Sequence, residues 1–330
     1  MFFKKLNKTI FSQLTVSEFN ETAIEIFHYQ YKNNKIYQEF VKLNHIDPEN
    51  VTSLEKIPFL PIELFKNHII VCGDEIPDDY FESSGTTGMQ RSKHYVKSLA
   101  VYEESFLNGF SYFYSNISDY CLIALLPNYQ AQKHSSLIFM IRKLIELTNH
   151  PDSGFYPDNM RELSVKLIEL YKAKQKTILF GVTYSLLDLA EQYPLKIPET
   201  IIFETGGMKG RRKEMVKEEL HSILRQAFHV DYIHGEYGMT ELLSQAYSKG
   251  NGIFNTPPWM KVVIRDINDP GSHLDFNRIG GINVIDLANY NSCSFIATQD
   301  LGKLYKDNSF EVLGRFDHSD IRGCNLMVSL

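Results

Sequence analysis

The sequence predicts an α/β protein, and three observations support this fold class. Short apolar runs that read as strands alternate with amphipathic helical patterns between residues 121 and 237, as in sheets whose strands are joined by crossover helices. Glycine-bearing loops occur at residues 83–88, 204–207 and 234–241, and α/β sheets bind ligands in such loops beyond the strand C-termini. From about residue 252 the helical pattern fades, which predicts a β-rich subdomain.

Length and composition narrow the class further. The chain has 330 residues, 43% of them hydrophobic, enough for a large core in one main domain with a smaller piece. The formal net charge is −6, from 34 basic and 40 acidic residues, which gives no support for nucleic acid as an electrostatic partner. The N-terminal residues lack the apolar run of a signal peptide, and no apolar stretch reaches the length of a membrane span. We therefore expect a cytoplasmic protein.

The four cysteines are Cys72, Cys121, Cys293 and Cys324. They are scattered and have neither CxxC pairing nor the spacing of zinc ligands, so a metal centre or a disulfide framework is not expected. Cys72, Cys121 and Cys293 lie in or beside apolar runs, which predicts packed thiols.

The N-terminal part predicts helices followed by an extended segment. Thr15 and Glu18 have capping-box spacing, and apolar residues then recur at helical intervals, so residues 15–45 read as helical. Two prolines in residues 57–66 fix an extended conformation, and the apolar residues around them predict that this segment packs on the core.

The remaining elements follow in order. Strands are predicted at residues 121–126, 176–182, 200–203, 230–233, 282–287 and 294–298, and helices at 135–147, 161–173 and 211–228. Residues 183–185 read as the loop after a buried strand.

Residues 81–93 concentrate glycines, hydroxyl side chains and cations. Gly85 and Gly88 allow backbone amides to turn toward a ligand, and Arg91 and Lys93 supply positive charge for an anion. These are the parts of a polyphosphate cradle, although the Gly-Lys-Ser/Thr ending of a Walker A loop is absent. A solvated Ser/Gly/Thr turn would have the same composition.

Four segments resemble, in order, motifs of the adenylate-forming superfamily of acyl and aryl ligases. They are Ser84-Gly85-Thr86-Thr87-Gly88, Tyr237-Gly238-Met239-Thr240-Glu241, Thr298-Gln299-Asp300-Leu301-Gly302 and Gly314-Arg315-Phe316-Asp317. They look like the phosphate loop, the Tyr-Gly-x-Thr-Glu motif, a Thr-Gly-Asp motif with Gln299 in place of glycine, and the Gly-Arg-x-Asp hinge. Within the superfamily the chain resembles acyl-protein synthetases of the LuxE type, through residues 57–61, 65–66, 126–129, 134–137 and 322–324.

The resemblance implies the large N-terminal domain of these enzymes, with mixed β-sheets flanked by helices, a β-rich subdomain and a truncated C-terminal tail. We divide the chain accordingly into a helical segment packed on the core (residues 1–80), an α/β nucleotide-binding core (81–250), the β-rich subdomain (251–313), and the hinge with the tail (314–330).

The resemblance also implies an ATP site. The residues that would hold the β- and γ-phosphates are Ser83, Ser84, Gly85, Thr86, Thr87 and Gly88. Lys93 or Arg91 would neutralise these phosphates. The family's usual lysine lies closer to the last loop glycine, so the choice between the two cations stays open. Glu241 matches the magnesium-binding glutamate, so ATP and Mg²⁺ are the implied cofactors.

Other motif residues would bind the rest of the nucleotide. Tyr237 would lie along the adenine, for which Gly206 and Gly207 would leave room. Thr240, in the same motif as Gly238, would bond the α-phosphate, and Asp300 would accept both ribose hydroxyls beside Arg315. Each match has a plainer alternative: a surface turn for residues 237–241, a hairpin turn for 300–302, a turn before a helix for 206–207, and a surface ion pair for Arg315.

The acyl side of the site would involve His134 and Cys324. His134 falls in the segment that lines the acyl side in relatives, where it would orient the carboxylate or act as a base, and a solvated histidine is the alternative. Cys324 matches the cysteine near the C-terminus that takes the acyl group as a thioester. Arg322 and His318 lie near it in sequence and would favour the thiolate, the nucleophilic form. An idle tail cysteine is the alternative.

Three functions are compatible with these residues. The first is ATP-dependent activation of a fatty or other carboxylic acid to acyl-AMP, followed by transfer to Cys324 and onward to a protein partner such as a reductase, carrier or transferase. The second is an acyl- or aryl-coenzyme A ligase of the phenylacetate ligase type, and the third is a non-catalytic adenylate-binding subunit. Relatives continue past the hinge into a domain that supplies a lysine, whereas this sequence ends near the hinge. We expect this to favour the first function, with Lys93, Lys209 or Lys303 in the place of that lysine.

Overall fold

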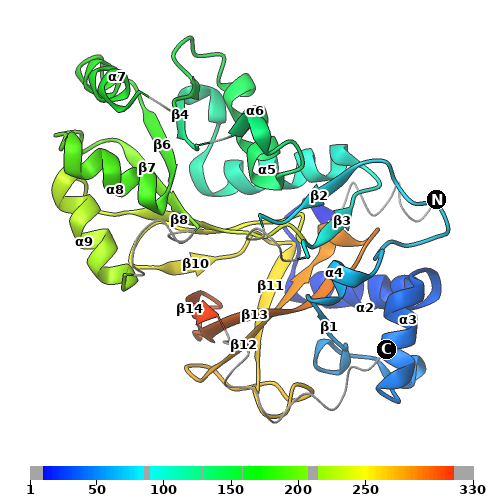
Figure 1. Ribbon diagram of the computed structural model, residues 1–330. Helices are drawn as coiled ribbons and strands as arrows, with labels where there is room; N and C mark the ends of the chain where they lie inside the picture. The colour runs from blue at the N-terminus through cyan, green and yellow to red at the C-terminus, as the bar shows by residue number, and fades with distance from the viewer. Residues whose placement is uncertain (1–9, 85–89, 128, 158, 207–214, 316–330) are drawn as a thin grey trace. The chain divides into compact units, whose positions relative to one another are not determined.

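The computed structural model describes residues 10–84, 90–127, 129–157, 159–206 and 215–315 (Figure 1). The chain forms two compact units. Unit 1 consists of Met1–Ser105, Gly238–Gln245 and Asn255–Leu330, and unit 2 of Phe106–Tyr237 and Ala246–Phe254. Helix α5 (Leu99–Tyr114) carries the chain from unit 1 into unit 2. The predicted division into four segments is not tested by these boundaries and stays a prediction.

Unit 2 is built on a parallel sheet, as the alternating pattern predicts. Its strands are β4 (Cys121–Leu125), β5 (Gly154–Phe155), β6 (Thr177–Val182), β7 (Ile201–Thr205), β8 (His234–Tyr237), β9 (Ala246–Ser248) and β10 (Ile253–Asn255), in the order β5-β4-β6-β7-β8-β9-β10. The pairs from β5 to β8 are parallel, and β9 runs antiparallel to β8. β4 and β6 are buried at every residue, which is typical of parallel strands covered on both faces.

The helices of unit 2 follow its strands. They are α6 (Ser136–Thr148), α7 (Met160–Lys172), α8 (Thr183–Gln192) and α9 (Lys217–Phe228). α6 packs against β4, and α8 packs against β6, β7 and α9. The α/β class predicted from the sequence is confirmed.

Unit 1 contains an antiparallel set of strands, a hairpin and the N-terminal helices. Its elements are α2 (Val16–Asn33), α3 (Lys35–Leu43), β1 (Leu60–Pro61), α4 (Leu64–Asn67), β2 (Tyr80–Glu82), β3 (Lys93–Tyr95), β11 (Met260–Arg265), β12 (Ile279–Asp286), β13 (Phe295–Leu304) and β14 (Phe310–Arg315). β11 to β14 are antiparallel neighbours, β1 pairs in parallel with β13, and β2 and β3 form a separate hairpin.

Aromatic rings fix the N-terminal helices on the strands of unit 1. Phe295 of β13 is fully buried, and the ring centroids of Phe27, Tyr37 and Phe59 lie 6.5, 6.1 and 6.3 Å from its own. Large rings bury the most apolar area per residue. The predicted packing of residues 57–66 on the core is therefore confirmed, since β1 also joins β13.

The first helical region divides at Asn34. The predicted capping box of Thr15 and Glu18 is present at the start of α2. Asn34 then ends α2 and caps α3, its side chain accepting a hydrogen bond from the Tyr37 amide at 3.0 Å. Asparagine favours this role because its short side chain competes with helical backbone bonds.

Some predicted boundaries were wrong. The strand predicted at residues 230–233 begins instead at His234, after His229 ends α9 in the left-handed conformation. The strand predicted at 294–298 continues to Leu304. Helix α9 begins at Lys217 rather than residue 211, although 211–214 lie outside the described residues. Helices α5 and α8 were not predicted. α8 is buried nearly all round and so lacks the polar stripe by which an amphipathic helix is recognised.

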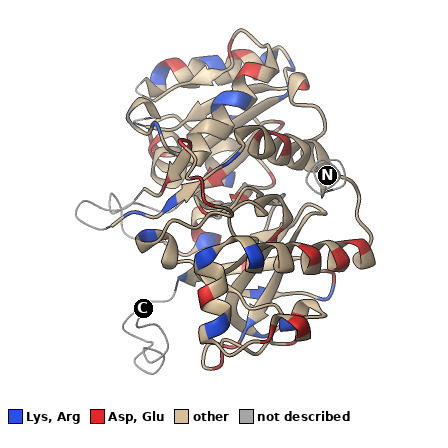
Figure 2. Ribbon diagram, turned by 90° about the vertical axis from the view of Figure 1, so that its right-hand side faces the viewer, with Lys and Arg blue, Asp and Glu red and all other residues tan. Residues whose placement is uncertain are grey.

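Charged side chains of both signs are interspersed along the ribbon (Figure 2). This distribution agrees with the small net charge of the sequence. None of the helices in the described part of the chain has both the length and the apolarity that crossing a membrane requires.

Asp286 organises the backbone that follows Glu241. Its buried carboxylate accepts hydrogen bonds from the Leu243 amide at 2.8 Å and from the Ser244 amide and hydroxyl at 2.9 and 2.6 Å. It also accepts from the Ala288 amide at 3.1 Å. One side chain thus satisfies three backbone donors that no water reaches.

We predict that Asp286→Ala lowers the free energy of unfolding by about 3 kcal/mol or more, because it leaves these buried amides without acceptors. Urea denaturation measures the change. Asp269→Ala removes an exposed contact to Ser272 and should cost less than about 1 kcal/mol. Equal losses in the two variants would contradict the role given to Asp286.

Candidate functional site

The β2–β3 hairpin holds the two ends of the predicted phosphate loop together. The Ser83 amide donates to the Ser92 carbonyl at 3.1 Å, and the Ser92 amide donates to the Ser83 hydroxyl at 3.0 Å. Glu82 accepts from Arg91 Nη1 at 2.9 Å. Ser84 is exposed at the start of the loop. The predicted ligands Gly85, Thr86, Thr87 and Gly88 lie outside the described residues.

Glu241 lies beside this closed end of the loop. Its side chain is buried, and its carboxylate takes a hydrogen bond from Ser92. Burial raises the pKa of Glu241, while the Ser92 hydrogen bond and the positive charges of Arg315 and Lys66 oppose the rise. A surface turn, the alternative for this motif, would leave the carboxylate in water. The structure instead brings it to the loop flank and to two cations.

Asp300 and Arg315 face each other on neighbouring strands. The register pairs them across β13 and β14, with Arg315 Nε 3.2 Å from Asp300 Oδ1. Asp300 is buried while Arg315 is largely exposed. Because Asp300 lies inside β13, the hairpin turn that was the alternative for residues 300–302 is wrong.

Helix α4 connects two of these motifs. Gln299, which stands where the motif usually has glycine, donates from Nε2 to Glu63 Oε1 at 2.6 Å. Gln90, at the end of the phosphate loop, donates from Nε2 to the Lys66 carbonyl at 2.7 Å. Gln90 thus holds the backbone of α4, and Gln299 holds the side chain of Glu63, the residue just before the helix. Lys66 was not predicted as a site residue, and its place in the Phe65-Lys66 pair of the resembling family was the signal that could have found it.

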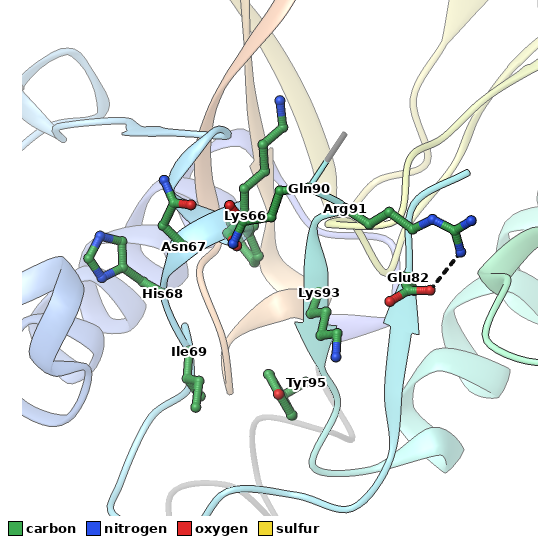
Figure 3. A pocket seen from close by; sticks show the side chains of 10 residues that line it. Lys66, Asn67, His68, Ile69, Glu82, Gln90, Arg91, Lys93 and Tyr95 are labelled. Carbon is green, nitrogen blue, oxygen red and sulfur yellow. Dashed lines mark hydrogen bonds and ion pairs between the residues drawn. The ribbon is translucent and has the colours of Figure 1, made fainter. Parts of the chain in front are cut away.

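A cavity of about 480 Å³ lies beside the hairpin in unit 1 (Figure 3). It is lined by Phe65, Lys66, Asn67, His68, Ile69, Glu82, Gln90, Arg91, Lys93 and Tyr95. In Figure 3 the Arg91 guanidinium turns to Glu82, and the amine of Lys93 points the other way from that of Lys66. The Lys93 amine lies 5.0 Å from the centroid of the Tyr80 ring. Three cations and one carboxylate give the cavity a net positive lining suited to an anion.

The predicted adenine-side residues belong to unit 2. Gly206 follows β7 and Tyr237 ends β8, and these strands pair in parallel. Gly206 has φ +73°, and a Cβ added there would meet nothing within 4 Å, so the position favours glycine and borders open space. The Tyr237 ring is buried with its centroid 6.0 Å from that of Phe254. Gly207 lies outside the described residues.

Of the two residues predicted on the acyl side of the site, His134 and Cys324, the structure describes His134 alone. His134 is exposed in the turn before α6, which Ser135 caps. Cys324 lies outside the described residues. Cys72, Cys121 and Cys293 are buried free thiols, as predicted. Burial raises the pKa of Cys72 to about 12 and that of Cys121 to about 11, so both stay protonated at neutral pH and are poor nucleophiles.

The described residues include a carboxylate that could hold a cation shared with phosphates. They contain no cluster of three or more His, Cys, Asp or Glu side chains that could hold a metal. Mg²⁺ bound with a nucleotide needs only one or two carboxylates plus phosphate oxygens. The buried carboxylate of Glu241 fits that requirement.

Comparison with solved structures defines the class of fold. The structure is similar to ATP-bound MatB from Rhodopseudomonas palustris, with a TM-score of 0.54 and 15% identity over 72% of this chain and 47% of that chain. It is also similar to 2-hydroxyisobutyryl-CoA ligase in the postadenylation state with R3-HIB-AMP, with a TM-score of 0.66 and 11% identity over 93% of this chain and 70% of that chain. The fold is therefore that of adenylate-forming ligases. The chain spans about half the length of MatB.

The family follows from the sequence profile. The profile of the family described as "Acyl-protein synthetase, LuxE" matches residues 12–330. The chain belongs to this family, as its motifs predicted. No curated protein gave a match.

We predict that Glu241→Gln stabilises the ligand-free protein increasingly as the pH rises. A carboxyl group whose pKa is raised on folding contributes stability below its unfolded pKa, near 4.5, and that stability is lost as the pH rises through the folded value. Glutamine cannot ionise, so it avoids this loss. Chemical denaturation at pH 4.5 and pH 8 should show a larger gain for the variant at pH 8.

The control for this pH series is Glu219→Gln on α9, where the side chain is exposed. Its difference from the parent protein should be small at both pH values. If the Glu241→Gln effect is equally small, or shrinks as the pH rises, it would contradict the claim that burial raises the pKa of Glu241.

Proposed function

We propose that this protein is an ATP-dependent acid–thiol ligase. It activates a carboxylic acid as acyl-AMP and transfers the acyl group to Cys324 as a thioester, for delivery to a protein partner. The observation that carries the proposal is the convergence on Glu241 of Ser92 from the phosphate-loop flank with the charges of Lys66 and Arg315. Membership of the acyl-protein synthetase family supports the same chemistry.

The first step joins the acid to the nucleotide. A carboxylate oxygen attacks the α-phosphorus, the bond from that phosphorus to the β-phosphate oxygen breaks, and pyrophosphate leaves with the electron pair. Positioning and charge neutralisation supply most of the rate in such transfers. Residues 83–88 hold the β- and γ-phosphates, and Arg91 or Lys93 neutralises them from the cavity side.

Glu241 would hold the Mg²⁺ that accompanies the nucleotide, and the ion would supply charge neutralisation. The carboxylate is already desolvated, so it loses little solvation when the cation arrives. Lys66 and Arg315 act on the same region by charge. Thr240 bonds the α-phosphate through its hydroxyl.

The remaining motif residues bind adenosine. Asp300 accepts the ribose hydroxyls, and its hydrogen bond from Arg315 fixes the direction of the carboxylate. Tyr237 lies along the adenine, with Gly206 and Gly207 leaving it space. His134 orients the acid or accepts its proton.

The second step moves the acyl group to sulfur. The Cys324 thiolate attacks the acyl carbon, the carbon–oxygen bond to AMP breaks, and AMP leaves with its electron pair. The alternative acceptor is coenzyme A, which the likeness to 2-hydroxyisobutyryl-CoA ligase favours. Acid-dependent exchange of pyrophosphate into ATP, screened over acids of varied length, tests the first step for both acceptors. Its absence with every acid would point to a non-catalytic subunit.

We predict that Cys324→Ser abolishes acyl labelling of the protein while leaving pyrophosphate exchange intact. The parent protein, incubated with radioactive fatty acid and ATP, should carry a label that hydroxylamine removes, since thioesters are cleaved by it. Cys121→Ala alters a buried thiol and serves as the control that keeps the label. Consumption of coenzyme A by an unlabelled protein would favour the alternative acceptor.

We predict that Lys66→Met lowers the rate of pyrophosphate exchange about tenfold or more. The variant loses a cation that acts on Glu241, and tenfold corresponds to about 1.4 kcal/mol of transition-state stabilisation. The matched control is Lys42→Met, which removes an exposed amine bonded to Gln38. If both variants keep the parent rate, Lys66 has no part in the reaction.

A further inference from the structure

His94 is buried in β3 and contacts two segments distant in sequence. Nδ1 lies 2.9 Å from the Thr240 carbonyl oxygen, and Nε2 lies 3.0 Å from Asn289 Oδ1. The Phe65 ring of α4 meets the imidazole edge-on, with centroids 5.7 Å apart. A cavity of about 10 Å³ that His94 helps to line has room for a single water at most. The ring is thus held from several sides.

Asn289 extends the contact to Glu241 itself. Its Nδ2 donates to the Glu241 carbonyl at 2.7 Å and to the Cys293 carbonyl at 2.9 Å. Both amide hydrogens are therefore used, and Oδ1 is the atom that faces His94. The reverse orientation would direct Oδ1 at two carbonyl oxygens. His94 and Asn289 together contact the backbone carbonyls of two consecutive residues, Thr240 and Glu241.

We propose that His94 is a positioning residue of the adenylation site, which fixes the backbone of Thr240 and Glu241 and so aims the Glu241 carboxylate. His94 alternates along β3 with Lys93 and Tyr95, which line the anion cavity. It faces inward while they face the cavity, because successive strand residues point to opposite sides. Strand β3, which follows the phosphate loop, therefore contributes side chains both to the anion cavity and to the backbone at Glu241. This role rests on the proposed function, since it is Mg²⁺ with ATP that Glu241 would hold.

The number of N–H donors on the His94 imidazole decides which substitutions test the proposal. Burial lowers the pKa of His94 to about 4, although the contacts to Thr240 and Asn289 raise it. A neutral ring donates one hydrogen, to one of its two acceptors, and either ring nitrogen can be the donor. Asparagine at this position has a donor near the place of Nδ1, and glutamine has one near the place of Nε2. Phenylalanine keeps a ring of similar shape and donates to neither.

The first experiment is hydrogen exchange of the ligand-free protein, followed in peptides that cover residues 239–244. We expect His94→Phe to speed exchange there about tenfold or more, and we expect His94→Asn or His94→Gln to stay within a few-fold of the parent. His273→Gln is the control, since it alters a part-buried ring of unit 1 that packs edge-on against Phe59. Unchanged exchange in His94→Phe would overturn the proposal, and so would an equal increase in His273→Gln.

The second experiment separates positioning from general support of the fold. In pyrophosphate exchange assays, His94→Phe should raise the Mg²⁺ concentration for half-maximal rate about tenfold and leave the KM of the acid unchanged. Equal changes in the Mg²⁺ concentration for half-maximal rate and in the KM of the acid would indicate general damage to the fold. That result would reject the positioning role of His94. If the parent protein shows no exchange with any acid, the proposed function fails, while the hydrogen-exchange result still decides whether His94 holds this backbone. Should His94→Phe not fold, the Asn and Gln variants decide. Each keeps a donor near the place of one ring nitrogen, so exchange that is about tenfold faster than in the parent in both variants would overturn the role.

Discussion

One buried carboxylate, that of Glu241, joins the separate parts of the candidate site in unit 1. Burying a charged group is costly unless other groups compensate it. Here the compensation comes from far apart in the sequence: a hydroxyl from Ser92, and the charges of Lys66 and Arg315. A protein that required only stability could place an apolar residue at this position. A carboxylate that bonds the flank of the phosphate loop and lies within the influence of two cations points to a use for its charge.

The surrounding contacts keep these groups in register. Gln90 and Gln299 connect α4 to the phosphate loop and to β13. Asp286 binds the amides just after Glu241, and Asn289 binds its carbonyl. The side chains of this network are polar, and those of Gln90, Asp286 and Asn289 bond backbone groups. Such fully bonded networks favour a single arrangement of the chain, which is the condition for aligning phosphates with a carboxylic acid.

The sequence was sufficient for the fold class and for the family, because glycine, hydroxyl and carboxylate residues are rare in that order by chance. It was not sufficient for the residues that support those motifs. Lys66 lies in a segment whose prolines and apolar residues indicate packing, and its place in the Phe65-Lys66 pair gave no role for its charge. His94 lies in a short strand where nothing marks its two acceptors, which come from residues more than a hundred positions away. The helix α8 escaped prediction because burial on all sides removes its periodicity, and the β8 boundary was misplaced because buried Val230 and Ile233 resemble strand residues. These errors have one cause: long-range contacts override local pattern.

Binding of ATP to the purified protein in the presence of Mg²⁺, measured by calorimetry, tests the central claim most directly. The account predicts one ATP per chain in the parent protein and a loss of affinity of about tenfold or more in Glu241→Gln, since a single charged contact to the bridging cation disappears. Parent protein that binds no ATP, or a Glu241→Gln variant that binds it as tightly as the parent, would contradict the claim that this buried carboxylate lies at a nucleotide site.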